Sequence, residues 1–286
     1  MAEYREPNIR ARQLGDRLLQ RMAEKGWGVR EMSRRLEMSA QWVSAVTRGR
    51  ARPSPVHLAR FLTTLGFRGE EYRELMAMGD EMRNPGLLER SENIRTLISL
   101  EEHANAISVF QANVVPGLLQ TGDYARNLAI EMGNQPELDK LDEHVFARLS
   151  RQAILTRPRV RFRFFLHEFV LLLPVGPPSV MIGQLRQLLR ISAQQNTTVR
   201  IVPARLGGHA ASAGHFQLME SDSYQPVVCI ESEVTSLYLE EPREIEAYRR
   251  VLSGLEGGAL DEANSKQFIA DLIGGADARS LAQEHL

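Results

Sequence analysis

The stretch EMSRRLEMSAQWVSAVTRGRARPSP, residues 31–55, decides the fold of the N-terminal region. Met32 and Leu36 are spaced to share one face of a first short helix. Val43 and Val46 are spaced to share one face of a second short helix, and only three residues join the two helices. The spacing predicts two short helices joined by a tight turn.

Capping residues mark the two ends of the second helix, and neighbouring segments also have helical patterns. Ser39 can cap the free amides of a first turn, and Gly49 can end the helix. Neighbouring periodicity predicts helices over 9–25, 29–36 and 39–48, one from Pro53 and Pro55 through Leu65, and one over 70–82. We therefore expect an all-α domain of five helices.

Charge is unevenly distributed along a chain of ordinary composition. The 286 residues are 43% hydrophobic and 25% charged, as in a soluble globular protein with room for about two domains. Residues 1–83 hold 16 Lys and Arg against 11 Asp and Glu, whereas the remainder holds 19 against 25. Between residues 26 and 68 there are eight Arg and two Glu. Such a surplus predicts an anionic partner, of which nucleic acid is the natural candidate.

The single cysteine and the N-terminus exclude several classes of protein. One cysteine, Cys229, allows neither a disulfide within the chain nor a multi-cysteine zinc site, and we expect it to be a buried apolar residue. The N-terminus is charged, and no stretch is long enough to span a bilayer. We expect a cytoplasmic protein with no metal and no cofactor.

Composition changes around MRNPGLLERSEN, which predicts domains over 1–83 and 84–286. We expect a helix over 94–110 and another toward HVFARLSRQAIL. Alternation of Phe162 and Phe164 with Arg161 and Arg163 predicts a strand. Further helices are expected near 168–174, 179–195, 242–255 and 265–273, and strands at TTVRIVP, HFQLME, PVVCIE and SLYLE. The predicted fold class is α+β, with the five-helix domain followed by a larger mixed α/β regulatory domain.

The order of helices, turn and arginines predicts a helix-turn-helix whose recognition helix is 39–48. Gln41 suits an adenine edge in the major groove, Arg48, Arg50 and Arg52 suit phosphates, and Trp42 can lie on the sugar-phosphate backbone. The alternative is that these arginines form a solvated face and that Trp42 packs on the fourth helix. The candidate DNA-binding residues are Arg30, Ser39, Ala40, Gln41, Trp42, Ser44, Ala45, Arg48, Arg50 and Arg52.

The segment VREMSRRLEMSAQWVSAVTRGRARPSPVHLARFLTTLG resembles the Xre/Cro type of helix-turn-helix domain. The resemblance implies that the helix after the turn reads an operator through Ala40, Gln41, Ser44 and Ala45. Two of these are alanines, which offer only methyl contacts. Val29 stands where the family often has a phosphate-binding Gln, and Glu37 replaces the usual turn glycine. Base readout is therefore expected to be sparse.

The remainder of the chain also resembles a known family. VPGLLQT followed by RLSRQ, then VRIVPARLGGH, GHFQLME and VVCIESEVTSLYLEEPREI, are similar to the domain that follows an Xre-type domain in actinobacterial regulators of the WhiJ kind. Those regulators are described as antitoxin-like and are often encoded beside a small partner protein. The resemblance implies that this chain has a small partner protein.

The segment VPGLLQTGDYAR has two interpretations. A proline-glycine turn can present side chains as a groove for a partner peptide or a small effector. Alternatively, its leucines join the core and Tyr124 packs on Arg126 or Arg151. The candidate partner or effector residues are Pro116, Leu118, Leu119, Gln120, Tyr124, Arg148 and Arg151.

No constellation meets the spacing of a catalytic site. HEF at 167–169 lacks the second zincin histidine, since position 171 is Leu. LGGHAASAGH lacks the residues that complete a P-loop, and Asp222, His215 and Ser221 lack a nucleophile elbow. We expect no catalytic residues, and a DNA-binding transcriptional regulator whose second domain dimerises and binds a partner protein or effector. The alternatives are an antitoxin-like interaction protein that autoregulates through DNA, and an enzyme fused to a DNA-binding module.

Overall fold

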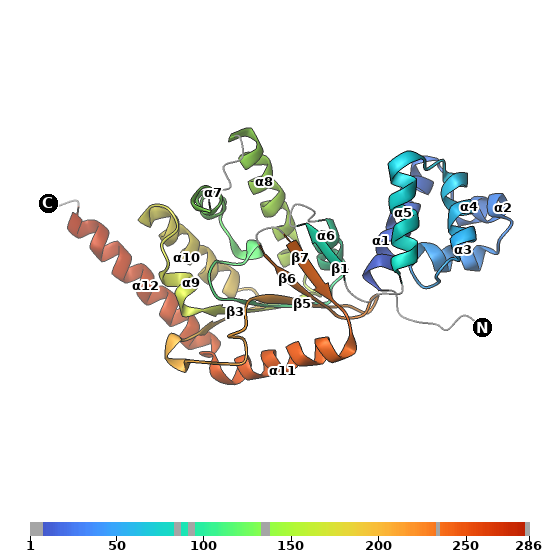
Figure 1. Ribbon diagram of the computed structural model, residues 1–286. Helices are drawn as coiled ribbons and strands as arrows, with labels where there is room; N and C mark the ends of the chain where they lie inside the picture. Colours follow the sequence, from blue (N-terminus) through green and yellow to red (C-terminus); the bar gives the residue numbers. More distant parts are fainter. Residues whose placement is uncertain (1–7, 83–86, 91–94, 133–137, 233–234, 284–286) are drawn as a thin grey trace. The chain divides into compact units, whose positions relative to one another are not determined.

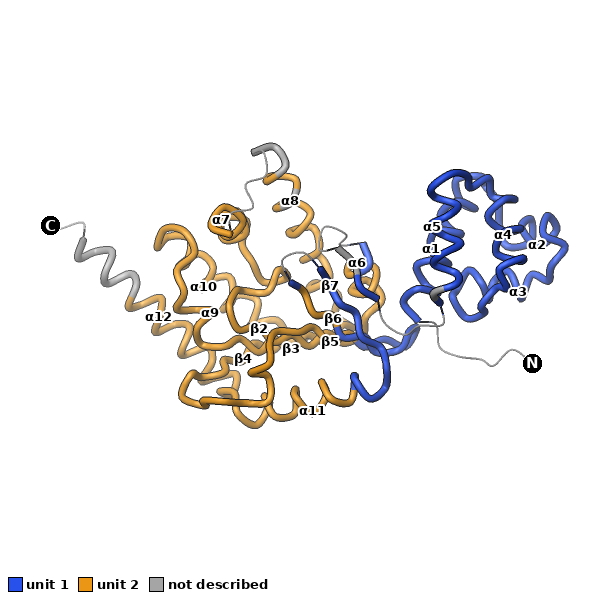
Figure 2. Tube along the Cα trace, viewed as in Figure 1, with its two compact units in different colours: residues 1–96, 220–228, 232–245 blue, residues 97–219, 229–231, 246–286 orange. Residues whose placement is uncertain are grey.

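The computed structural model describes residues 8–82, 87–90, 95–132, 138–232 and 235–283. The chain divides into two compact units, shown in Figure 2. Unit 1 contains residues 1–96, 220–228 and 232–245, and unit 2 contains residues 97–219, 229–231 and 246–286. The predicted domain boundary between residues 83 and 84 lies outside the described residues.

The five predicted N-terminal helices are confirmed, in the order α1 Ile9–Glu24, α2 Val29–Leu36, α3 Ala40–Thr47, α4 Pro55–Leu65 and α5 Gly69–Glu81 (Figure 1). Caps start three of them, since the side chains of Asn8, Ser39 and Ser54 each accept a hydrogen bond from a first-turn amide. The apolar faces meet in one core that includes Leu14, Met32, Val43 and Phe61. This core fixes how the short α2 and α3 are oriented, because such short helices are marginal alone.

The turn between α2 and α3 has the three predicted residues, and Glu37 takes the place expected for glycine. Glu37 is the C-cap of α2 with φ 52° and ψ 39°, the left-handed conformation, and it is the only described non-glycine residue with positive φ. Its amide nitrogen contacts the carbonyl oxygens of Ser33 and Arg34, which closes the end of the helix. A glutamate in this conformation stores strain that a glycine would relieve.

Gly15 of α1 lies directly against the end of α3. A Cβ atom built on Gly15 would fall 2.9 Å from the carbonyl carbon of Thr47 and would clash with the Thr47 oxygen. Because the obstructing atoms belong to the backbone, no side-chain rotation relieves the clash. The absence of a side chain at Gly15 therefore allows α1 to approach α3 closely.

Unit 1 also contains strands from both ends of the second region. β1 Leu87–Arg90 pairs antiparallel with β7 Thr235–Leu239, and the first residues of β6 Val227–Glu231 lie next to β7 in the sheet order. β6 and β7 were predicted. β1 was not predicted, because its sequence falls within MRNPGLLERSEN, the segment in which the domain boundary was placed. Strand β1 is therefore a structural part of this unit.

Unit 2 is built on a sheet in the order β6-β5-β2-β3-β4, with β2 Ala106–Gln111, β3 Arg161–His167, β4 Thr197–Val202 and β5 Phe216–Glu220. β2, β3 and β4 run parallel. The helix predicted over 94–110 is wrong in its second half, because α6 Arg95–Glu102 ends before β2 begins. β2 is buried on both faces, and such a strand forms an apolar run that periodicity does not separate from a helix.

Helices cover both faces of this sheet. In Figure 1, α7 Gly122–Glu131, α8 Leu138–Arg151 and α10 Pro178–Ser192 lie on one face, and α11 Pro242–Gly258 lies on the other. α12 Glu262–Gln283 packs on α10 and β4. Short elements complete the connections: η1 Gly117–Leu119, η2 Gln152–Thr156, α9 Glu168–Leu172 and η3 Ala204–Leu206. Among the described helices, none has both the length and the apolar character needed to cross a membrane.

Substituting Gly15 tests whether the α1–α3 contact fixes the helical domain. Gly15→Ala is expected to lower the free energy of unfolding by about 1 to 3 kcal/mol, because the added methyl forces the two backbones apart. Gly183→Ala is the matched control, since a Cβ at this α10 position meets nothing within 4 Å. The control is expected to be neutral or to stabilise the protein by up to about 1 kcal/mol. Equal effects in urea unfolding would contradict the proposed contact.

Candidate nucleic-acid interface

One side of α3 is buried and the other is open to solvent. Val43 and Val46 are 0% and 2% exposed and face the core. Ala40 and Gln41 are exposed, and Ser44 and Ala45, one turn later, are partly exposed. Ser44 follows Ala40 by four positions and Ala45 follows Gln41 by four, so each pair lies on the same side of the helix. The predicted reading residues therefore form a continuous solvent-facing surface.

The N-terminus of α3 is fixed by Ser39. Its Oγ accepts a hydrogen bond from the amide of Trp42 at 3.1 Å, as the sequence predicted. Ser39 is also exposed, so the capped first turn, with Ala40 and Gln41, is accessible to solvent. A major-groove helix contacts base edges with its N-terminal residues, and this is the end of α3 that is free to do so.

The loop after α3 is folded back onto the helix. Gly49 has φ 69°, a left-handed conformation that favours glycine. The amides of Arg50 and Ala51 then both donate to the carbonyl of Ala45, at 2.8 and 3.1 Å. These bonds hold the backbone of the arginine loop in a fixed place beside the exposed face of α3.

Ion pairing separates the basic residues of this region into two groups. Arg34 and Arg35 both contact Glu31, and Arg60 contacts Glu37. A second group is exposed and forms no ion pair with any residue that the structure describes. Its members are Arg30, Arg48, Arg50, Arg52 and Arg68. Four of these five arginines, all except Arg68, are the ones that the sequence predicted for DNA.

Trp42 packs within the protein. Its ring lies 5.6 Å from the His57 ring, edge-on, and 6.2 Å from the Phe61 ring, both on α4. The sequence allowed Trp42 to lie on the DNA backbone or to pack on the fourth helix. In the structure the Trp42 ring packs on the fourth helix, α4, and is only partly exposed. His57 is exposed beside Trp42. The contact between these two rings was not predicted, because it depends on how α3 and α4 pack.

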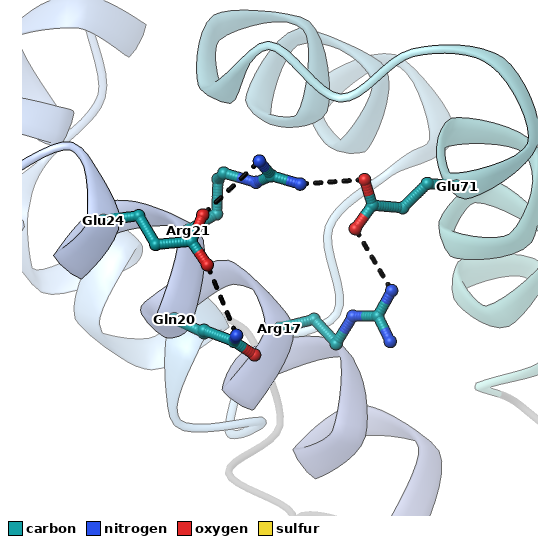
Figure 3. A network of polar contacts seen from close by, with 5 residues as sticks. All are labelled: Arg17, Gln20, Arg21, Glu24 and Glu71. Carbon is teal, nitrogen blue, oxygen red and sulfur yellow. Dashed lines mark hydrogen bonds and ion pairs between the residues drawn. The ribbon is translucent and has the colours of Figure 1, made fainter.

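The basic residues of α1 are neutralised instead. Figure 3 shows Glu71 of α5 between two α1 guanidinium groups, with Arg17 at 3.2 Å and Arg21 at 2.8 Å. Arg21 also contacts Glu24 at 3.4 Å, and its guanidinium lies 4.6 Å from the centre of the Phe67 ring. These groups and Arg95 line a polar depression, in which Glu71 and Glu24 offset the charges of Arg17 and Arg21.

The candidate partner residues in unit 2 do not form an exposed groove. Leu118, Leu119 and Tyr124 are at most 2% exposed, and the Tyr124 hydroxyl accepts a hydrogen bond from the Val115 amide. Burial raises the pKa of Tyr124. Pro116 and Gln120 are buried as well. The prediction that this segment presents its apolar side chains is therefore wrong, because they fill the core.

The two arginines of that candidate set have different surroundings. Arg151 forms two hydrogen bonds with the carboxylate of Glu101, and its charged form is favoured because that carboxylate raises its pKa despite burial. Arg148 donates to the neutral side chain of Gln120 at 3.0 Å. The packing of Tyr124 on Arg126 or Arg151, which the alternative interpretation proposed, stays a prediction.

Two other sequence features have structural roles. His167 ends β3 and its Nδ1 accepts a hydrogen bond from the amide of Phe169, so it caps the short α9. Arg163, from the alternating strand, contacts Glu256 and donates to Ser108 at 3.0 Å. Cys229 is buried, as predicted.

Two family models match the chain. Residues 13–75 match a helix-turn-helix domain, and residues 94–271 match a domain of unknown function, DUF5753. The chain belongs to the DUF5753 family. The helix-turn-helix match covers the exposed α3 and its arginine loop, and it supports the predicted DNA-binding regulator.

Comparison with other proteins adds little to these matches. None of the curated proteins compared with the chain matches it. The solved structure of TrmBL2, described as an archaeal chromatin protein with a novel mode of DNA binding, shares 14% identity with a TM-score of 0.27. The match covers 82% of this chain and 87% of that chain. A TM-score of this size does not indicate a shared fold.

Substitutions in α3 and its loop separate phosphate contacts from base contacts. Arg50→Ala is expected to weaken binding to operator and random duplex alike and to reduce the slope of log K against log[salt] by about one unit. Gln41→Ala is expected to cost about 1 to 3 kcal/mol on the operator and little on random DNA. Arg73→Ala removes an exposed arginine that pairs with Glu70 on α5 and serves as the charge control. Fluorescence anisotropy across a salt series measures the affinity of all three variants for both duplexes. An equal loss of affinity for operator and random DNA in Gln41→Ala would refute the reading role of Gln41.

Proposed function

We propose that this protein is a sequence-specific transcriptional regulator that inserts α3 into the major groove of double-stranded DNA. The observation that supports the proposal most strongly is the pairing pattern of the arginines. Arg48, Arg50 and Arg52 follow an exposed, capped helix and lack carboxylate partners among the described residues. Phosphates supply the missing negative charge, and Gln41 supplies the amide that distinguishes adenine.

A single copy of α3 offers few side chains that can read bases. Ala40 and Ala45 can contribute only methyl contacts, which leaves Gln41 and Ser44 as the polar readers. One short recognition helix reaches a few base pairs, so high specificity requires two copies on one operator. We therefore propose that the protein binds DNA as a homodimer.

The second region is proposed to receive a partner or effector and to change operator affinity. Segments of this region belong to unit 1 and contact the start of α1. The Ile9 amide donates to Glu240 Oε2 at 2.9 Å, and Glu240 is 3% exposed. The guanidinium of Arg12 lies 4.0 Å from the centre of the Tyr224 ring. Because α1 contacts α3 at Gly15, a shift in the segments bearing Glu240 and Tyr224 can reach the recognition helix.

The dimer hypothesis predicts the spacing of the operator. Two half-sites are expected about one helical turn apart, or a multiple of that distance, since a two-fold protein presents two recognition helices to one side of the duplex. A genome-wide footprint of the tagged protein identifies the operator, and sedimentation gives the stoichiometry on it. A monomer both free and on the operator would contradict the dimer.

Regulation predicts reciprocal coupling between operator and effector. An effector or partner protein that binds the second region is expected to change the operator Kd by about 5- to 150-fold, and operator DNA must change effector affinity by the same factor. Both affinities are measured by titration of the full chain, and Tyr224→Leu is compared with Tyr224→Phe, which keeps the aromatic face under Arg12. Effector binding with unchanged operator affinity would show that the second region is only a tether.

A further inference from the structure

Two arginines of α8 lie three residues apart in unit 2, and only one of them, Arg151, pairs with a buried carboxylate. Arg151 donates from Nε and Nη2 to the two oxygens of Glu101, at 3.0 and 2.7 Å. Gln217 donates to the same carboxylate at 3.0 Å. Glu101 is 2% exposed, so its charge is directed entirely at these neighbours. One buried carboxylate therefore balances one guanidinium, that of Arg151.

Arg148 lies three residues before Arg151 and lacks an equivalent partner. Its described hydrogen bond goes from Nη1 to the neutral Oε1 of Gln120 at 3.0 Å, and no described carboxylate forms an ion pair with it. Glu231 is exposed and acts on Arg148 only through longer-range attraction. Burial lowers the pKa of Arg148, and the positive charge of Arg151 lowers it further. Arg148 is thus a half-buried guanidinium that forms no ion pair with a described carboxylate.

The surroundings hold Arg148 in one orientation. Gln120 is 2% exposed, and its Nε2 donates to the Val115 carbonyl at 2.6 Å, which leaves its Oε1 directed at Arg148. Gln152 donates to the carbonyls of Gly117 and Gln120, at 3.2 and 2.6 Å. The alkyl chain of Arg148 runs alongside Gly117. A binding residue held in place by a hydrogen-bonded shell of this kind loses little freedom when a ligand arrives.

We propose that Arg148 binds the carboxylate or phosphate group of a small organic anion. A guanidinium has five N–H donors, and Gln120 uses one of them, so the remaining donors can bind a two-oxygen face of an anion. Half burial favours a small ligand, because only a compact anionic group reaches the guanidinium. The assignment rests on the proposed function, since it names the chemical class of the effector.

The test uses the full-length protein with inorganic phosphate and with acetate as probes, at constant ionic strength set by chloride. Calorimetric titration compares the wild type with Arg148→Gln and with Arg126→Gln, an exposed arginine paired with Asp142. All three proteins keep the DNA-binding arginines, so their difference isolates the α8 site. Arg148→Gln is expected to weaken binding of at least one probe by about tenfold or more, and Arg126→Gln to leave it unchanged. Equal binding of both probes by all three proteins overturns the proposal.

A second measurement avoids any dependence on variant folding. Phenylglyoxal modifies arginines of the wild-type protein, and mass spectrometry follows Arg148 and Arg126 separately. The probe that binds is expected to slow modification of Arg148 and not of Arg126; no protection by either probe overturns the assignment. Operator binding is measured on the same samples. If the wild-type protein binds operator but neither probe protects Arg148, only the Arg148 assignment is refuted. If a probe protects Arg148 but the wild-type protein binds no operator, only the DNA-binding function is refuted.

Discussion

The contact between Gly15 of α1 and the end of α3 is the constraint on which the DNA-binding unit depends. With no Cβ at Gly15, the two backbones meet at the Thr47 carbonyl. The Thr47 hydroxyl donates to the Val43 carbonyl at 3.0 Å, which keeps its side chain on its own helix. With one side of α3 fixed in this way, Gln41 and its neighbours must lie on the solvent side.

Electrostatics within the unit depends on which arginines have carboxylate partners. The basic surplus of residues 26–68 overstates the charge that is available, because Glu31 neutralises part of α2 and Glu37 contacts Arg60. Arg48, Arg50 and Arg52, which follow α3, are among the arginines without an ion pair to a described residue, and we propose that they contact the phosphate backbone beside a major groove that holds α3. On α8, likewise, Arg151 has a carboxylate partner in Glu101, whereas Arg148 has no described ion pair. In both units we propose the anion site from a missing carboxylate partner, more than from the number of arginines.

Local features of the sequence predicted much of the helical domain. The apolar spacing and the Ser39 cap each depend on residues close in the chain, and the structure has both. The strands β1 and β2 were missed, because a short edge strand resembles a linker and a fully buried strand has no alternation. Contacts between distant residues, such as Glu101 with Arg151, were likewise not predicted, since the local pattern of either residue carries no information about the other.

We propose that α3 reads DNA through Gln41 while its arginine loop holds phosphates. The most direct test is a crystal structure of the full-length protein on a duplex taken from its genomic footprint. We expect α3 in the major groove, with the Gln41 amide within hydrogen-bonding distance of a base edge and Arg50 on a phosphate. A complex in which α3 faces solvent and the duplex lies on another surface would contradict the account.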